Sequence, residues 1–543
     1  MQRTVTAAIL FIMSGSVLLT SGYFYDELND VKRWSVVVGS LLLLVVCSLM
    51  PKGFSSLFRA VRSSLFCVGM SVIGTVLSVQ GVLQYLHVLA SHNAYFHVTG
   101  SYENPAGFAV AVCVMFPFAV HLLSRRPSHL WQRLFGAVAA MVMVVAVVLS
   151  QSRSGILALC VSIGVMLTGV SEVRRWVLKY RYQVLAAVVL LVPCVLFGLY
   201  CMKPDSADGR LFIWRVCLDM IRESPLTGYG PSGFLTHYMP AQADYFSSHP
   251  DSQYMLLSDN ITHPFNEYLK LTVKYGMVGL LASLLLLVMW IRGVWINGGK
   301  YRHVALSVMS VLFILCQFSY PFNYAISWFV AALSLLYASP ESVFAWFSHR
   351  IRRSLLSAGF MTLLSYSFYN MYHELKWAAI SRRSLAGYTE QMIPHYELML
   401  PHMKDNHLFL YNYAADLNYI GSYDESMRLT KACTHLCLDY DVQMLLADNL
   451  EQTGRTDDAV AAYSIASLMI PNRLVPLESI MDIYLSLADT VRADSVAWVI
   501  LGKRVKVPSA AVEQIMRDAR EWLDGGGHEK SEGGTGEGGP IQS

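Results

Sequence analysis

The chain has 543 residues, of which 54% are hydrophobic and only 15% are charged, and its mean hydropathy is +0.42. A soluble globular domain carries about 25% charged residues, so this composition excludes a wholly soluble protein. The formal net charge of +3 is too small to indicate a nucleic-acid partner.

About eleven apolar stretches in residues 1–372 are long enough to span a bilayer. The predicted spans lie at about residues 5–22, 34–50, 65–89, 105–123, 134–150, 155–171, 183–202, 265–291, 304–320, 324–338 and 354–372. No convincing cleavage site follows the first stretch, so we interpret it as a retained span and not as a signal peptide. The predicted fold class is therefore all-α, a polytopic membrane helix bundle with a C-terminal α-helical domain.

Lysine and arginine gather in alternate loops, such as 174–181, 292–302 and 350–353. The positive-inside rule then places the N-terminus in the cytoplasm. Eleven crossings put the C-terminal domain and the long loop at 203–262 on the outside. We expect three parts: the membrane domain 1–372 with this loop, a helical domain at 373–523, and a disordered Gly-rich tail at 524–543.

Four stretches with unusual residues meet on the outside by topology. They are residues 99–107 (TGSYENPAG), 150–155 (SQSRSG), 208–230, which includes PLTGYG, and 262–269 (THPFNEYL). Arg153, in the second stretch, stands between two apolar runs that almost no loop separates. Charge in hydrocarbon is costly, so its guanidinium must lie at the interface or in a water-filled cavity. A snorkelling arginine is the structural alternative, but this face disfavours positive charge.

Arg210 and Arg215 lie in a stretch that can form an amphipathic helix, with Asp208 as a possible N-cap and Trp214 as an interfacial anchor. Two arginines that merely face solvent on a surface helix would explain this pattern as well as two arginines with a functional role. His263 precedes a proline at the mouth of a predicted span, where a helix N-terminus suits an anion and a neutral imidazole can accept a proton. A loop histidine with satisfied hydrogen bonds is the alternative.

The ten cysteines show no metal-ligand spacing, and we expect no metal site. Cys433 and Cys437 lie four residues apart on a predicted helix, and we interpret them as small core residues.

In this order along a polytopic chain, the four stretches resemble the O-antigen ligase superfamily, which also includes O-antigen polymerases and bacterial protein O-oligosaccharyltransferases. Residues 100–106 resemble its glycine–aromatic–asparagine–proline segment, and residues 152–155 match its serine–arginine–serine–glycine turn. Residues 209–230 resemble its large periplasmic loop. Residues 263–269, followed by KYGMVGL at 274–280, resemble its histidine–asparagine helix start. The resemblance covers roughly residues 95–290.

The resemblance implies a metal-independent glycosyltransferase without cofactors in the bacterial inner membrane. Such enzymes move a glycan from undecaprenyl diphosphate to an acceptor hydroxyl at the periplasmic face. The residues expected to be catalytic are His263 as base, with Arg153 and Arg210 at the diphosphate. The residues expected to bind substrate are Arg215, Asn104, Asn266 and Glu267. Many relatives carry a histidine directly before the asparagine, where this chain has Phe265, so His263 has the catalytic role only if the family histidine is the earlier one.

The C-terminal domain shows the spacing of a tetratricopeptide repeat, with a weaker copy 33 residues upstream. The first set is Ala447, Gly454, Ala459, Tyr463, Ala466 and Pro471, and the weaker copy carries Ala414 and Gly421. An unrelated array of helical hairpins is the alternative. A repeat array offers a surface for a protein partner or for the acceptor.

The leading hypothesis for function is O-antigen ligation to a lipid A–core acceptor. Transfer to a protein and extension of the lipid-linked glycan by a polymerase are alternatives that differ only in the acceptor. A non-catalytic polysaccharide transporter or scaffold is a fourth possibility. A transporter more often has ionisable residues at mid-membrane and paired halves, and this sequence shows no such internal symmetry.

Overall fold

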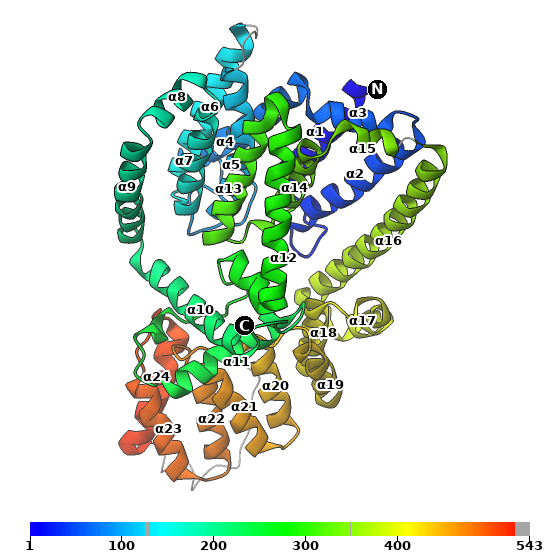
Figure 1. Cartoon of the computed structure of the whole chain (residues 1–543). Coiled ribbons are helices and arrows are strands. Elements are labelled where there is room, and N and C mark those ends of the chain that lie inside the picture. The colour runs from blue at the N-terminus through cyan, green and yellow to red at the C-terminus, as the bar shows by residue number, and fades with distance from the viewer. Residues whose placement is uncertain (125–129, 348, 527–543) are drawn as a thin grey trace. The chain divides into compact units, whose positions relative to one another are not determined.

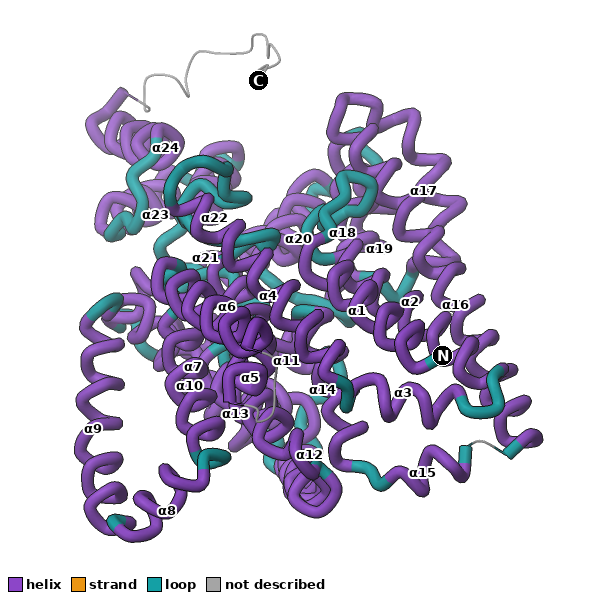
Figure 2. The backbone as a smooth tube through the Cα atoms, turned by 90° about the horizontal axis from the view of Figure 1, so that it is seen from above, coloured by secondary structure: helices purple, strands orange, loops and turns teal. Residues whose placement is uncertain are grey.

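The computed structural model describes residues 1–124, 130–347 and 349–526, and none of these residues lies in a strand (Figures 1 and 2). The all-α fold class is therefore confirmed for the described chain. Two compact units divide it. The first unit contains Met1–Met202, Phe265–Tyr268 and Val278–Arg382, and the second contains Lys203–Pro264, Leu269–Met277 and Arg383–Ser543.

The first unit is a bundle of apolar helices built around α5 (Pro105–Ser124). This helix is apolar on all sides and buried along most of its length, as expected for a helix at the centre of a bundle. It packs against α4, α6, α7, α13 and α14. The other helices of this unit are α1 (Gln2–Leu18), α2 (Asp30–Leu49), α3 (Gly53–Val61), α4 (Ser64–Tyr85), α6 (Leu130–Leu149), α7 (Arg153–Leu167), α8 (Ser171–Lys179), α9 (Arg181–Cys201), most of α12 (Glu267–Asn297), α13 (Arg302–Phe318), α14 (Ala325–Ala338), α15 (Glu341–Trp346) and α16 (Arg350–Arg383), with short turns η2 (Gly299–Tyr301) and η3 (Pro321–Asn323).

Each predicted span coincides with a helix, and six described helices are long and apolar enough to cross a membrane. These are α2, α4, α5, α6, α12 and the segment Gly299–Phe318 that contains α13. The pair α7 and α8 makes a seventh if it counts as one span bent by 96°. Three more are shorter apolar helices, Gln2–Leu18, Arg181–Val195 and Ala325–Ala338. The predicted span at 354–372 lies within α16, which is not in either group. The chain is thus a multi-pass helical membrane protein in which six or seven of the predicted crossings have full spanning length.

The second unit joins the long segment at 203–264 to the C-terminal helices. Its first part is helical: α10 (Pro204–Glu223), α11 (Gly233–Ser248) and the short turn η1 (Gln253–Leu257). The C-terminal part contains η4 (Ser384–Tyr388), α17 (Thr389–Met403), α18 (His407–Tyr419), α19 (Tyr423–Thr434), α20 (Tyr440–Gln452), α21 (Thr456–Met469), α22 (Val475–Ser486), α23 (Thr490–Gly502), α24 (Ala510–Glu521) and η5 (Trp522–Gly526). Helix α11 packs against α21, so the segment at 203–264 and the C-terminal helices share one unit. Of the expected tail at 524–543, residues from 527 onward lie outside the described residues.

Helices α18 to α23 form three successive hairpins (Figure 1). Their first helices begin at His407, Tyr440 and Val475, which are 33 and 35 residues apart. The turn of the first two hairpins contains a left-handed glycine, Gly421 at φ +80° and Gly454 at φ +75°. In the third hairpin Ala488 takes this place at φ +55°. The sequence indicated only two copies because the glycine that marks the turn is absent from the third.

One predicted helix cap is wrong. Helix α10 begins at Pro204, with Lys203 as its N-cap, so Asp208 lies inside the helix and does not cap it. Proline at the first helical position explains this start, since its fixed φ suits a helix and the missing N–H would have no partner in the helix there. Cys433 and Cys437 are buried and not joined by a disulfide, as expected for core residues.

Candidate active site

Asn104 caps the central helix of the first unit. Its Oδ1 accepts hydrogen bonds from the backbone N–H groups of Ala106 at 2.8 Å and Gly107 at 3.0 Å. Its Nδ2 donates to Glu103 Oε1 at 2.9 Å and to the Tyr320 hydroxyl at 3.0 Å. Asn104 therefore holds the start of α5 in place, and its amide group is already engaged by the protein.

Two tyrosines that sequence reasoning missed surround this cap. The Tyr324 hydroxyl donates to Glu103 Oε1 at 2.9 Å, and its ring leaves no room for a side chain at Gly107, where a Cβ would lie 2.7 Å from a ring carbon. Tyr320 bonds Asn104 and stacks on Tyr324. Tyr320 ends one predicted span and Tyr324 begins the next, and tyrosine at the end of a span is so common that its presence gave no signal.

Arg153 is the first residue of α7 and is half-buried. Ser152 caps the helix, since its Oγ accepts from the Gly155 N–H at 3.3 Å. Gly155 allows α7 to approach α5 closely, because a Cβ there would lie 2.7 Å from Ala109 Cβ. Gln151 has φ +53°, an uncommon conformation for a residue other than glycine. The serine–arginine–serine–glycine turn thus fixes Arg153 where α7 begins.

The fourth stretch also ends in a helix cap. Asn266 is buried, and its Oδ1 accepts from the Tyr268 N–H at 3.0 Å at the start of α12. Phe265 has φ +54°, and its ring centroid lies 5.4 Å from that of Tyr320. Glu267 is the first residue of α12. Within the first unit, Tyr320 therefore contacts both the segment that ends at Asn104 and the segment that holds Asn266.

In the second unit, α10 is attached to the segment that contains His263. The Trp214 Nε1–H donates to the Pro264 carbonyl at 2.9 Å. Arg210 is half-buried on this helix, whereas Arg215 is exposed, with its guanidinium carbon 5.2 Å from the centroid of the Tyr245 ring. The two arginines therefore have different surroundings, and only Arg210 is partly shielded from solvent.

His263 is half-buried before α12. Burial, with help from the positive charges of Lys270 and Lys274, lowers the pKa of His263 to about 3. Its imidazole is therefore neutral at physiological pH. Lys270 and Lys274 lie four residues apart on one face of α12, and sequence reasoning gave neither a role. The available signal was a pair of cations inside an otherwise apolar run of spanning length.

The last part of the third stretch forms hydrogen bonds with a break in α12. Gly276 has φ +62° and ψ −166°, and the helix bends there. The segment at 225–230 pairs with this break: the Tyr229 N–H donates to the Val273 carbonyl at 2.9 Å, and the Gly230 N–H to the Lys274 carbonyl at 2.8 Å. The Met277 N–H in turn donates to the Pro225 carbonyl at 2.8 Å. The PLTGYG motif and the KYG motif are thus two halves of one structure.

Each unit therefore gathers part of the predicted site. The first contains Asn104, Arg153, Asn266 and Glu267, and the second contains Arg210, Arg215 and His263. Among the described residues, no group of three His, Cys, Asp or Glu side chains could hold a metal ion. The positive side chains suit an anionic ligand, and the neutral histidine suits proton transfer.

Comparison with known proteins gives one family match. The family described as O-antigen ligase matches residues 138–284, roughly a quarter of the chain. This range contains Arg153, Arg210, Arg215, His263, Asn266 and Glu267, while Asn104 lies before it. No curated protein matches the chain.

Proposed function

Because residues 138–284 belong to the O-antigen ligase superfamily, we propose that this membrane protein transfers a glycan from undecaprenyl diphosphate to an acceptor hydroxyl. The proposed acceptor is lipid A–core, and the proposed place is the periplasmic face of the bacterial inner membrane. The family match carries the proposal, since it covers the serine–arginine–serine–glycine turn, α10 and the His263 segment in one continuous range.

Positive charge at the leaving group supports glycan transfer from a diphosphate carrier. Breaking the glycosidic bond leaves negative charge on the diphosphate, which arginine can bind through two parallel hydrogen bonds. Arg153 and Arg210 are the proposed partners. Lys270 and Lys274 add positive charge beside His263, so we include them in the donor site.

His263 is the proposed general base. Its lowered pKa keeps the imidazole neutral and able to accept a proton from the acceptor hydroxyl. A base with a pKa of about 3 is weak, however. The bound diphosphate would oppose the charges of Lys270 and Lys274 and would raise the pKa toward the working pH. Donor binding would thus activate the base.

A protein acceptor is the second candidate, and the C-terminal hairpins favour it. Stacked helical hairpins of about this period are typical of tetratricopeptide repeats, which bind peptides and proteins. We propose that α18 to α23 form such an array and contribute to acceptor selection. A polymerase that extends the lipid-linked glycan has no comparable support.

Deletion of the gene and complementation test the proposal. A ligase mutant should lose the O-antigen ladder on its lipopolysaccharide while glycoprotein profiles stay unchanged. Loss of glycoprotein signal with an intact ladder would instead establish the protein acceptor. Purified protein should transfer a labelled glycan from undecaprenyl diphosphate, and the Arg153→Ala variant should do so on the order of 100-fold more slowly. If both profiles stay normal and the pure protein transfers no glycan, the proposal is wrong.

A further inference from the structure

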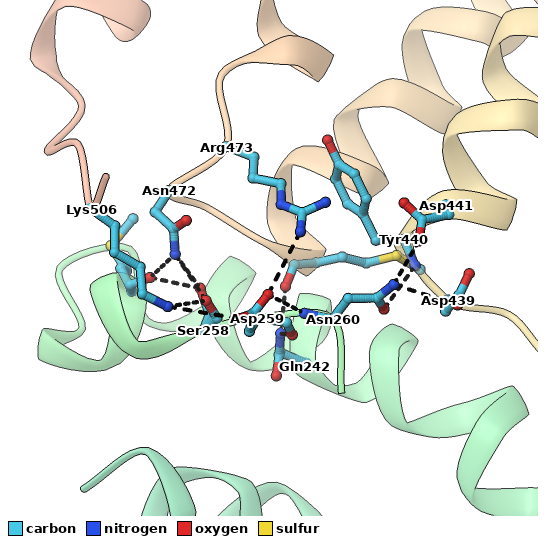
Figure 3. Close-up of polar contacts among 12 residues, drawn as sticks. Gln242, Ser258, Asp259, Asn260, Asp439, Tyr440, Asp441, Asn472, Arg473 and Lys506 are labelled. Atoms are coloured by element: carbon cyan, nitrogen blue, oxygen red, sulfur yellow. Dashed lines mark hydrogen bonds and ion pairs between the residues drawn. The ribbon is translucent and has the colours of Figure 1, made fainter. Parts of the chain in front are cut away.

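The C-terminal helices hold the segment at 250–260 through side-chain hydrogen bonds (Figure 3). Asn472 Nδ2 donates to the carbonyls of Met255 at 2.9 Å and Ser258 at 3.0 Å. Gln242 is fully buried and donates to the Met469 carbonyl at 2.6 Å. Buried amide groups with satisfied partners fix one arrangement of the two segments.

Four cations lie along this junction, and one acid engages two of them. Asp259 forms ion pairs with Arg473 at 3.6 Å and with Lys506 at 3.9 Å (Figure 3). Lys503 and Arg504 form no ion pair with any residue in the described ranges. Two positive charges therefore stay uncompensated at this place.

These two cations line a cavity of about 570 Å³. On one side its wall comes from the segment at 250–256, with Gln253 and Met255, and on the other from Asn472, Val499, Lys503 and Arg504. Asp251 is the one acid in this described lining. The volume falls in the range of small-ligand sites, and the lining mixes apolar surface with hydrogen-bonding groups.

Lys503 is a partly desolvated cation in the wall of this cavity. Its side chain is half-buried, and burial alone lowers the pKa of its ammonium group. Burial of a cation without a paired acid disfavours its charged form, and such a group in a cavity is a candidate for binding an anion. An anion that entered the cavity would supply the missing charge.

We propose that this cavity binds the acceptor through a negatively charged sugar, one that carries phosphate or carboxylate. The amide group of Gln253 and the Oδ1 atom of Asn472 suit sugar hydroxyls, while Lys503 and Arg504 suit the anionic substituent. The assignment to the acceptor rests on the proposed function. Binding of an anionic saccharide stands without it.

The cavity also adjoins the candidate catalytic helix. Its wall includes part of η1, and η1 packs against α10, where Gly209 lies beside Leu257. Arg210 follows Gly209 directly. An acceptor held in the cavity would therefore be bound by the same short turn that supports the helix of Arg210.

Direct binding to the full-length protein in detergent tests the site. The probe is a fluorescently labelled core oligosaccharide from deacylated lipopolysaccharide, with and without its phosphates. The Lys503→Gln/Arg504→Gln double variant should bind the phosphorylated probe roughly tenfold more weakly, because it loses charge-assisted hydrogen bonds. Asp251→Asn should bind it more tightly. The Arg428→Gln/Lys431→Gln variant removes the same charge from an exposed face of α19 and should bind as wild type.

A second variant, which fills the cavity, distinguishes loss of the site from a folding defect. Gly502 lines the cavity, and a Cβ there meets no atom within 4 Å, so Gly502→Trp should fill the space without straining the backbone. It should block the probe while thermal stability is preserved. Wild-type affinity in both the charge variant and the tryptophan variant would overturn the proposal.

Kinetic measurements test the saccharide site and the proposed reaction separately. In the transfer assay the charge variant should raise the KM for the acceptor and leave the KM for the donor unchanged. A rise in the donor KM alone would overturn the assignment to the acceptor. Charge-dependent probe binding by a protein that transfers no glycan would uphold the saccharide site and refute the proposed function. Displacement of the probe by short-chain phosphatidylglycerol, but not by unlabelled oligosaccharide, would identify a lipid site and refute the saccharide.

Discussion

At the scale of single residues, the polar side chains that stand out in the sequence divide into two groups. Asn104 and Asn266 cap α5 and α12 through their Oδ1 atoms, and these bonds explain their place before helices. Arg153 and His263 are half-buried, and their side chains suit an anion and proton transfer respectively. We therefore expect the chemistry to depend on the arginine and the histidine, and the folding of the site on the asparagines.

Substitution of Arg153 should separate catalysis from folding. Arg153→Ala should lower turnover on the order of 100-fold, because the developing diphosphate charge loses a preorganised partner. Arg153→Lys should recover only part of this, since an ammonium group cannot form the two-pronged contact. Transfer assays on purified protein measure both. Near-normal turnover by Arg153→Ala would remove this residue from the mechanism.

The lowered pKa of His263 predicts a specific pH dependence. In the protein without donor the imidazole should stay neutral from pH 8 down to pH 5, so the ratio of kcat/KM for the donor between wild type and His263→Gln should not vary over this range. Turnover of His263→Gln should be strongly reduced at every pH. If kcat/KM of the wild type for the donor fell below about pH 6.5 and that of the variant did not, the lowered pKa would be contradicted.

The same pKa has a consequence for stability. The unfolded chain takes up a proton at His263 near pH 6.5, whereas the folded protein resists it down to about pH 3. Stability should therefore fall as the pH drops below 6.5, and His263→Gln should remove part of this loss. Thermal melts at pH 7 and pH 5 measure the difference, with exposed His249→Gln as the control.

At the scale of elements, the break in α12 is formed by two motifs together, PLTGYG at 225–230 and KYG at 274–276. Gly228 and Gly276 lie where backbones meet: a Cβ on Gly228 would be 2.4 Å from the Val273 carbonyl, and one on Gly276 would be 2.1 Å from the Leu226 carbonyl. Both glycines also have positive φ. The glycine-rich pattern at these positions is therefore explained by backbone packing, without any direct part in chemistry.

Alanine at Gly276 should destabilise the protein. The added Cβ must displace backbone and take up a left-handed conformation, so we expect a loss of at least ~1–3 kcal/mol. Gly359→Ala is the matched control, because a Cβ on this glycine of α16 meets no atom within 4 Å. That change should be neutral or slightly stabilising. Equal melting temperatures for Gly276→Ala and wild type would refute the packing role.

The third C-terminal hairpin allows the reverse substitution, from a left-handed alanine to glycine. Ala488 occupies the left-handed position that Gly421 and Gly454 occupy in the other two hairpins. Ala488→Gly should therefore stabilise the protein by about 1 kcal/mol, whereas Gly454→Ala should destabilise it by a similar amount. Thermal melts of the two variants measure the signs. A lower melting temperature for Ala488→Gly would show that the turn is not strained.

At the scale of the whole molecule, the segment at 203–264 and the C-terminal helices fold as one unit. Asn472, Gln242 and the packing of α11 on α21 tie residues 203–264 to the chain beyond residue 383. Deletion of residues 400–543 should therefore remove the support of α11. We expect loss of transfer to every acceptor, with greater protease sensitivity at 203–264.

Full transfer activity by this truncated protein would contradict the shared unit. Limited proteolysis followed by mass spectrometry locates the exposed segment. The Gln242→Leu variant provides a milder test, because it leaves the chain complete and removes only the side-chain hydrogen bonds of Gln242 with Met469, Asp259 and Tyr238. It should weaken the unit without abolishing membrane insertion.

The asymmetry of lysine and arginine predicts the topology. Reporter fusions after about residue 375 should be active only with periplasmic reporters, and fusions in the 174–181 loop only with cytoplasmic ones. Cytoplasmic activity after residue 375 would mean an even number of crossings before the C-terminal helices.

The sequence by itself determined the features that depend on local composition. Apolar length located a helix at every predicted span, and the order of short motifs identified the family later matched at residues 138–284. The 33-residue spacing of small residues located two of the three hairpins. These patterns can be recognised in the sequence because hydrophobic length, helix caps and turn glycines are local requirements.

Only the tertiary structure decided which distant segments meet. The contacts of Tyr320 with Asn104 and Phe265, the pairing of PLTGYG with the break at Gly276, and the cavity at Lys503 all join residues far apart in the chain. The lowered pKa of His263 likewise depends on burial and on the two lysines Lys270 and Lys274 of α12. Burial, charge proximity and backbone contact are properties of packing, and no local pattern in the sequence encodes them.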